Sequence, residues 1–346
     1  MKITMPDASL SRSLLTLQLL FLVACVSGRD PDRWKGLDKA PIAPGRVFLN
    51  MDEEGAGPRV LAVVAHPDDE TVFAATLFKL SSHLDATCDL LTITNGEGGF
   101  KYSTLAEGMY GLELTEESVG RAHLPKIRRE ELLEGCSYLG LRSVEFLLET
   151  DHRYTQDPSE VLGEEAEVWD LKRIGGILDG RLEAGDYDFV FTMAPTATTH
   201  GHHQAATILA LQAVARRPSG QRPVILCAST RAAAEDAPLE VVPLEGYPET
   251  ATTDAQFSFD RSQGFGYRGK LTYQVIVNWV IAAHKSQGTM QLAMNLGVFE
   301  DFSLFELNDE GAEQRARELF DALQGEQFPA KEYGPSAGAV PIPRKP

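Results

Sequence analysis

Short apolar runs alternate with amphipathic stretches along most of this chain. The apolar runs predict strands at residues 59–65, 88–94, 144–149, 188–194 and 223–228. The segments between them place apolar residues at helical spacing and predict helices near 70–82, 126–139, 169–184 and 203–217. Strands that alternate with helices are typical of parallel sheets. We therefore expect an α/β fold: a Rossmann-like, mostly parallel, doubly wound sheet with helices on both faces.

The rest of the sequence fits one large domain with an appendage at each end. We predict that the domain covers residues 58–330, with a tether rich in Asp, Arg, Pro and Gly over 26–57 and a Pro-rich, disordered tail over 331–346. Two parts of the domain lack clear periodicity. We expect 97–125 to form a long loop over the site and 229–268 to supply a second wall of the pocket.

Charge and cysteine content narrow the choice of partners. The chain has 50 acidic and 32 basic residues and a formal net charge of -18, which argues against nucleic acid and anionic membrane surfaces as partners. Cys88, Cys136 and Cys227 each lie in an apolar stretch. We expect them to be buried thiols and not part of a disulfide framework.

The first polar cluster follows the first predicted strand. The segment His66-Pro67-Asp68-Asp69-Glu70 leaves that strand where the chain must turn. In open α/β sheets ligands bind outside the carboxyl ends of the strands. One imidazole and one carboxylate are suitable ligands for zinc, which leaves the second carboxylate free to act on a metal-bound water. The alternative is a turn with a polar helix cap.

A second cluster follows the strand predicted at 188–194. His200, His202 and His203 fall within four residues, although the whole chain has 8 histidines. They lie at another junction of strand and helix, on the same presumed edge of the sheet. His200 and His203 are three apart and share a face of a helical turn, whereas His202 should point elsewhere. The alternative is a solvated polar loop.

Together the clusters resemble the PIG-L/LmbE-like de-N-acetylases, which remove acetyl groups from N-acetylglucosamine-type substrates. That family has an A-H-P-D-D-E motif after its first strand, matched here by residues 65–70, and a later H-x-x-H pair, matched by 200–203. Further similarities follow in order along residues 58–290. They are Thr94-Asn95-Gly96-Glu97-Gly98, Arg128-Arg129-Glu130-Glu131 with Leu139-Gly140-Leu141, Asp151 at a strand end, and Ala283-His284-Lys285-Ser286-Gln287.

The resemblance implies a set of roles for the first cluster and its partner. His66, Asp69 and His203 would be the three protein ligands of Zn²⁺ or another divalent metal, with one position left for water. Asp68 would be the general base that takes the proton of that water and passes it to the leaving amine. Glu70 and Glu131 would support the ligands.

Further residues are assigned by the same resemblance. His200 would stabilise the developing oxyanion, best in its protonated form. Arg128, Asn95 and His284 are candidates for substrate binding, although an exposed helix arginine and a core histidine are the alternatives. The family commonly has Asp between its paired histidines, where this chain has His202. Histidines 83, 123 and 152 belong to no motif and are expected to be ordinary surface residues.

The expected function is that of a zinc-dependent hydrolase that removes an N-acetyl or other N-acyl group from an amino sugar or glycoconjugate. Two alternatives remain open. One is a non-catalytic protein that keeps the fold and binds a sugar, and the other is a metallo-hydrolase of an ester or phosphoester. The sequence predicts neither the substrate nor the oligomeric state.

The N-terminal segment predicts the compartment. Residues 14–24 form an apolar stretch that is too short to span a bilayer and is typical of a signal peptide. It ends in Leu22-Val23-Ala24-Cys25, which resembles the bacterial lipobox. We therefore expect residues 1–25 to be a lipoprotein signal, with Cys25 lipidated and the protein held in the cell envelope by this anchor alone. The alternative is a cleaved signal and a secreted protein.

Overall fold

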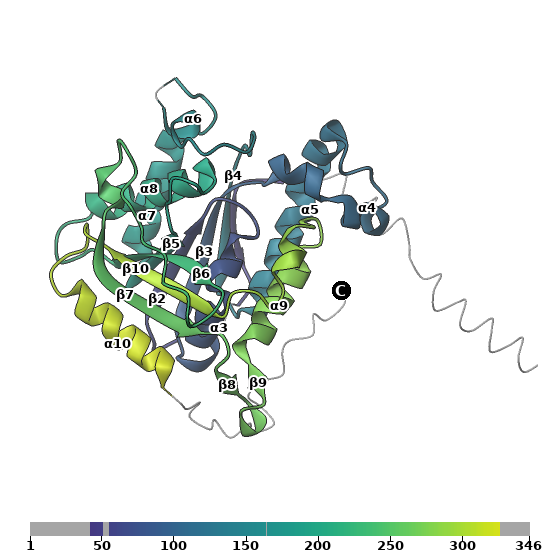
Figure 1. The fold of residues 1–346 in the computed structure, drawn as a ribbon. Coiled ribbons are helices and arrows are strands. Elements are labelled where there is room, and N and C mark those ends of the chain that lie inside the picture. The colour runs from purple at the N-terminus through teal and green to yellow at the C-terminus, as the bar shows by residue number, and fades with distance from the viewer. Residues whose placement is uncertain (1–41, 51–54, 164, 326–346) are drawn as a thin grey trace, which may run out of the picture. The chain divides into compact units, whose positions relative to one another are not determined.

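The computed structural model describes residues 42–50, 55–163 and 165–325. The expected signal peptide, Cys25, the first part of the tether and the tail over 331–346 lie outside these residues. Figure 1 shows the described part as a central sheet with helices around it.

The main sheet has eight strands in the order β1-β4-β3-β2-β5-β6-β10-β7. The five central strands are parallel, and β1, β10 and β7 are antiparallel to their neighbours. The predicted mostly parallel α/β sheet is therefore confirmed. The strands are β1 Gly45–Phe48, β2 Arg59–Val64, β3 Thr87–Thr94, β4 Ser143–Glu149, β5 Phe189–Met193, β6 Val224–Arg231, β7 Thr252–Asp260 and β10 Phe299–Phe305.

The order of the parallel strands reverses between β2 and β5. After β2 the chain builds outward through β3 and β4, then returns to place β5 on the other side of β2. The two strands pair in register, with Val60 opposite Phe189 and Ala62 opposite Phe191. Such a reversal leaves a crevice outside the carboxyl ends of the two strands, where ligands bind in open α/β sheets. Both polar clusters of the sequence follow these two strands.

Alternate residues of β2 face two separate hydrophobic cores. Val60, Ala62 and Val64 contribute to one core, and Leu61 and Val63 to the other. Both sets are almost completely buried, because helices cover both faces of the sheet. This explains why the strand is a continuous apolar run and does not alternate with polar residues.

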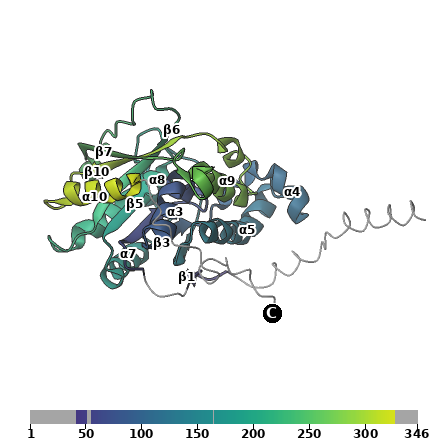
Figure 2. The same cartoon turned by 90° about the horizontal axis from the view of Figure 1, so that it is seen from below.

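The helices divide between these two faces. Helix α9 packs against both α3 and α5, and with α10 they cover the face of Val60 (Figure 2). Helices α6, α7 and α8 cover the face of Leu61. The helices are α3 Ala74–His83, α4 Thr104–Tyr110, α5 Glu117–Tyr138, α6 Ser159–Leu162, α7 Leu171–Gly185, α8 Gly201–Arg216, α9 Tyr273–Ala283 and α10 Ala312–Gln324. The described residues also form short elements: η2 Asp69–Phe73, η3 Glu97–Tyr102, η4 Pro248–Thr250, η5 Tyr267–Gly269, η6 Met290–Ala293, β8 Gly264–Phe265 and β9 Leu271–Thr272.

Two expectations about irregular segments were wrong, and a third segment has more regular structure than local periodicity indicates. The expected tether contains strand β1, which pairs with β4 at the sheet edge. The expected loop over 97–125 is largely helical, with η3, α4 and the start of α5. The segment 229–268 supplies the end of β6, all of β7 and the short β8. Strand β7 adds an edge to the main sheet by pairing with β10, a contact between distant segments that local periodicity does not signal.

Two further observations bear on the predicted class of protein. Cys88, Cys136 and Cys227 are buried and free of disulfides, as expected. Among the described residues, no helix combines the length and apolar character that crossing a bilayer requires.

Candidate metal centre

The turn after β2 is shaped by Asp69. Its Oδ2 atom accepts hydrogen bonds from the backbone N–H groups of Ala65 (3.0 Å) and His66 (2.8 Å). These bonds fold the chain back sharply at the end of the strand and start the short helix η2. They also hold the carboxylate beside the imidazole of His66, so that two potential ligands leave the same strand end.

The third side chain comes from the start of α8, after β5. His203 Nε2 lies 3.0 Å from His66 Nδ1 and 3.1 Å from Asp69 Oδ1, and His66 Nδ1 lies 3.6 Å from Asp69 Oδ2. Ligands of a tetrahedral zinc ion, at about 2.0–2.1 Å from the metal, are about 3.3 Å from one another. His66, Asp69 and His203 therefore lie at distances that suit a zinc-like ion.

The surroundings of these three residues suit cation binding. Burial alone would lower the pKa of His66, but the carboxylates of Asp151, Asp69 and Asp68 outweigh it and raise the pKa to about 9. Burial alone would raise the pKa of Asp69, but His203 and His66 hold it well below its usual range. The local field thus favours positive charge, which a metal ion supplies permanently. The His203 side chain is 17% exposed, so solvent can reach the three candidate ligands.

Asp68 lies against an arginine from helix α5. Arg128 Nη2 is 2.9 Å from Asp68 Oδ2 and also donates to the carbonyl oxygen of Pro67 at 2.9 Å. Arg128 is only 2% exposed. The expected alternative, an exposed helix arginine, is therefore wrong, and Arg128 instead holds the turn that carries Asp68.

The close approach of Arg128 requires a glycine after β3. Arg128 Nη1 donates to the carbonyl oxygen of Gly96. Gly96 has φ of 70°, and a Cβ atom there would lie 2.1 Å from Arg128 Nη1. Both the backbone conformation and the lack of space favour glycine at this position.

His200 is the N-cap residue of α8, and its environment differs from the expectation. Its Nδ1 atom accepts the backbone N–H of His202 at 3.0 Å, so the proton of a neutral ring is on Nε2. Burial, then the neighbouring His66 and His203, lower the pKa of His200 to about 3. The expected protonated His200 is thus a neutral imidazole, which still offers one N–H donor.

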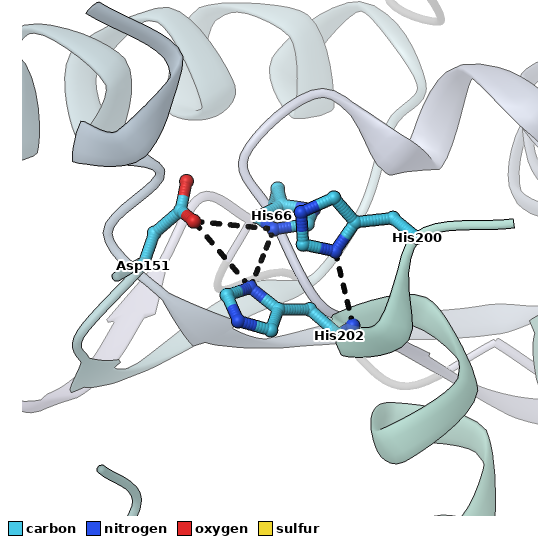
Figure 3. A group of neighbouring side chains, drawn as sticks. All are labelled: His66, Asp151, His200 and His202. Atoms are coloured by element: carbon cyan, nitrogen blue, oxygen red, sulfur yellow. Dashed lines mark hydrogen bonds and ion pairs between the residues drawn. The ribbon is translucent and has the colours of Figure 1, made fainter. Parts of the chain in front are cut away.

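A second group of potential ligands shares His66. Figure 3 shows His66, Asp151, His200 and His202 converging from three strand ends. His66 Nε2 lies 3.1 Å from His202 Nδ1 and 3.9 Å from Asp151 Oδ1, and the last two atoms are 3.4 Å apart. Asp151 was noted only as a strand end, although it follows β4 at the same sheet edge. His152 was expected to be a surface residue, but its Nδ1 lies 3.0 Å from His202 Nε2.

Four residues expected near substrate or ligands have other contacts. The side-chain amide of Asn95 donates to backbone carbonyls of Leu148 and Glu149 at the end of β4. His284 is fully buried against Glu70, and Glu131 accepts hydrogen bonds from Ser286 and Tyr110. In the described structure these side chains stabilise the fold around the site. His284 in particular cannot bind substrate while it is fully buried.

Glu97 is a residue whose properties sequence reasoning missed. It lies in η3, 8% exposed, near Asp151. Burial raises the pKa of Glu97 to about 7, and the carboxylate of Asp151 adds to the rise. The sequence signal that could have identified Glu97 is its position in a Gly-rich segment directly after β3.

Comparison with known proteins gives the same family as the motifs. Residues 61–214 match the family model for PIG-L, GlcNAc-PI de-N-acetylase. An N-acetylglucosaminyl-phosphatidylinositol de-N-acetylase from Bos taurus is 27% identical over 169 residues, which are 48% of this chain and 55% of that protein. The chain therefore spans about half the length of this curated relative.

Solved structures match parts of this chain at low sequence identity. An N,N'-diacetylchitobiose deacetylase from Pyrococcus horikoshii is 23% identical, with 48% of this chain and 54% of that chain covered and a TM-score of 0.33. A 4-carboxy-2-hydroxymuconate hydratase from Pseudomonas putida is 14% identical, with coverage of 71% and 95% and a TM-score of 0.45.

The matched segment contains both polar clusters and the strands that carry them. It begins within β2 and ends within α8, so it includes His66, Asp68, Asp69, His200 and His203. Residues 61–214 of this chain are a PIG-L domain, with the fold and sequence motifs of the PIG-L/LmbE-like de-N-acetylase family.

Proposed function

We propose that this protein is a zinc-dependent hydrolase that removes an N-acetyl group from an amino sugar or a glycoconjugate. The observation that carries the proposal is the convergence of His66, Asp69 and His203 at distances suited to a tetrahedral ion, within a PIG-L domain. Asp68, next to a ligand in sequence and paired with Arg128, is the candidate base.

Zinc bound by these three residues supplies a Lewis acid that polarises the acyl carbonyl and promotes deprotonation of a water molecule. Asp68 accepts a proton as the oxygen of that water forms a bond to the carbonyl carbon. Arg128 fixes the orientation of the carboxylate through its ion pair and through the bond to Pro67. The neutral ring of His200 donates its Nε2–H to the carbonyl oxygen as negative charge develops there.

Breakdown of the tetrahedral species completes the reaction. The C–N bond breaks, and Asp68 returns its proton to the departing nitrogen. The products are acetate and a free amine on the sugar. Each proton removed by Asp68 is thus returned in the same turnover, and the carboxylate is regenerated.

The two alternative functions differ from this one in measurable products. A sugar-binding protein without activity would bind the N-acetyl sugar and release neither acetate nor amine. A hydrolase of esters or phosphoesters would cleave those bonds in preference to amides, because an activated water attacks acyl and phosphoryl centres alike. The fold does not separate these functions, since one fold supports many reactions.

The test is a substrate screen with purified, zinc-loaded protein. N-acetylglucosamine, N,N'-diacetylchitobiose, N-acetylglucosamine glycolipids, acyl esters and phosphoesters are each incubated with the protein, and free amine, acetate and phosphate are measured. We expect amine and acetate in equal amounts from at least one N-acetyl sugar, and a large loss with Asp68→Asn. Preferential release of phosphate or of an alcohol from an ester would reject the amide assignment.

We also propose that the protein acts in a bacterial cell envelope, held by a lipid on Cys25. The support is the segment Leu22-Val23-Ala24-Cys25 at the end of a short apolar stretch. Substrates of an enzyme so located would be glycans or glycoconjugates outside the cytoplasm.

A further inference from the structure

A row of imidazole rings connects the candidate metal centre with the protein surface. His66 Nε2 lies 3.1 Å from His202 Nδ1, and His202 Nε2 lies 3.0 Å from His152 Nδ1. His152 Nε2 then lies 3.0 Å from Glu160 Oε2. The His202 side chain is completely buried, whereas the side chains of His152 and Glu160 are 22% and 27% exposed. Figure 3 shows the inner end of this row, where His202 meets His66.

When a metal holds His66 in its neutral form and the other two rings are neutral, the acid at the outer end fixes the direction of every hydrogen bond in the row. An ionised carboxylate only accepts, so His152 donates its Nε2–H to Glu160. This hydrogen bond is the main reason that the pKa of Glu160 lies below its ordinary value. A neutral imidazole with its proton on Nε2 has a lone pair on Nδ1. His152 Nδ1 therefore accepts from His202 Nε2–H, and His202 Nδ1 in turn accepts from His66 Nε2–H.

The direction of these hydrogen bonds also determines which nitrogen of His66 carries a lone pair. With its proton on Nε2, the lone pair of His66 is on Nδ1, the atom that faces Asp69 and His203. This is the atom that would bind the metal. A metal-bound imidazole usually donates its other N–H to a carboxylate or carbonyl, which fixes the ring and its tautomer. In this chain His202 accepts that N–H, at the position where the family commonly has Asp.

We propose that His202, His152 and Glu160 form a relay that holds the proton of His66 on Nε2 and so directs the Nδ1 lone pair towards the metal. The inference rests on the metal site of the proposed function but not on the reaction catalysed there. None of the three residues needs to touch the substrate, so they are positioning residues. Ring contacts support the arrangement: His202 lies between His152 and His66, with ring centroids 5.0 Å and 5.3 Å away, and packs on Trp169 at 5.1 Å.

The competing interpretation is a second cation between His66, His202 and Asp151. The three ligand distances of 3.1, 3.4 and 3.9 Å would permit it. Such an ion would require both nitrogens of His66 to bind metal at once, with loss of the proton on Nε2. The relay satisfies every nitrogen of the row without that loss. One oxygen of Asp151 also has a partner of its own, the backbone N–H of Gly98 at 3.1 Å.

The direct test is a long-range ¹H–¹⁵N spectrum of the full chain with labelled histidine, recorded with one equivalent of zinc. We expect His66, His202 and His152 to carry their ring protons on Nε2, with the Nδ1 signal of His66 shifted by the metal. A proton on Nδ1 of His202 would overturn the proposal. So would a His66 without a proton on Nε2 together with tight binding of two zinc ions per chain by equilibrium dialysis.

Variants separate the relay from a merely structural role. His202→Asp keeps an acceptor for the Nε2–H of His66, whereas His202→Leu removes it. We expect zinc affinity to fall about 10- to 100-fold in His202→Leu and to return largely to the wild-type value in His202→Asp. His152→Phe interrupts the row without contacting His66, and should also weaken zinc binding and disturb the tautomer of His202. If His202→Leu fails to fold, His152→Phe gives the same comparison from the partly exposed end of the row.

The control is His123→Ala, which removes a histidine of helix α5 that is neither a relay member nor a proposed ligand. Its zinc affinity should match that of the wild type. Equal losses in His202→Leu and His202→Asp, with the tautomers of His66 and His202 unchanged in His152→Phe, would show that ring packing matters and the relay does not. Because metal affinity and tautomers are measured without substrate, these results stand whether or not the protein proves to be a deacetylase.

Discussion

The imidazole of His284 lies against the carboxylate of Glu70, with 2.5 Å between Nε2 and Oε1, and both side chains are completely buried. Glu70 ends the A-H-P-D-D-E motif, and His284 follows helix α9, more than two hundred residues later. Burial alone would lower the pKa of His284, but Glu70 outweighs it and raises the pKa. The pair therefore links the turn that carries Asp68 and Asp69 to the late part of the chain.

Removal of one partner of this pair should destabilise the protein. Glu70→Ala leaves a buried imidazolium without a counter-charge, and we expect the free energy of unfolding to fall by about 3–5 kcal/mol. Chemical denaturation measures the change. The control is Glu70→Leu combined with His284→Leu, which removes both charges and should recover part of the loss. A double variant as unstable as the sum of its single variants would contradict a paired interaction.

Metal binding should depend on His203. His203→Ala removes the one proposed ligand that comes from the segment after β5. We expect the purified variant to contain far less zinc than the roughly one ion per chain of the wild type. Elemental analysis gives the ratio, with His123→Ala as the matched histidine control. Unchanged zinc content in His203→Ala would remove this residue from the ligand set.

The adjacent carboxylates should have separable roles. Asp68→Asn should keep the zinc and lose about a hundredfold or more in kcat, because it removes the general base and leaves the three ligands in place. Asp69→Asn should lose zinc affinity first. Measurement of zinc content and kcat on both variants decides the assignment, and an exchange of the two phenotypes would reverse it.

Glu97 should make stability depend on pH in a defined direction. Its carboxyl has a pKa of about 7 in the folded protein, against 4.5 as the ordinary value. Between these values a rise in pH removes the proton from the unfolded chain while the folded protein keeps it, so unfolding becomes more favourable. The ionisation of Glu97 thus lowers the free energy of unfolding by up to about 3 kcal/mol above pH 7 and has no effect below pH 4. Glu97→Gln removes this loss of stability.

Thermal unfolding at several pH values tests this prediction. The Tm of Glu97→Gln should exceed that of the wild type increasingly from pH 5 to pH 8. The exposed Glu113, changed to Gln, serves as the control and should show no such trend. A constant difference in Tm across this range would mean that the carboxyl of Glu97 ionises normally.

The proposed anchor is testable without reference to activity. If Cys25 is acylated, mass spectrometry of the mature protein should find a lipid on an N-terminal Cys25, and the protein should fractionate with membranes. Cys25→Ser should abolish both. An unmodified mature N-terminus at another residue would refute the lipid anchor and leave the hydrolase proposal untouched.

The sequence alone determined the central sheet and placed the two polar clusters at its edge. Mostly apolar runs predicted all five parallel strands, because strands covered on both faces are mainly apolar. The polar residues that follow two of these runs include His66, Asp69 and His203, which the family resemblance proposes as ligands and which the structure brings together. Local sequence was sufficient here, since parallel strands end at one edge of the sheet and bring their following turns together.

Only the tertiary structure decided what depends on contacts between distant segments. Strands β7 and β10 form an antiparallel edge whose pairing joins residues about forty to fifty positions apart, beyond the reach of local periodicity. The neutral state of His200 follows from burial, from His66 at the end of another strand and from His203 in the same helix. In the same way, His152 joins the site because β4 ends beside the start of α8. Protonation and hydrogen-bond partners are properties of a three-dimensional environment, and the order of residues along the chain does not contain them directly.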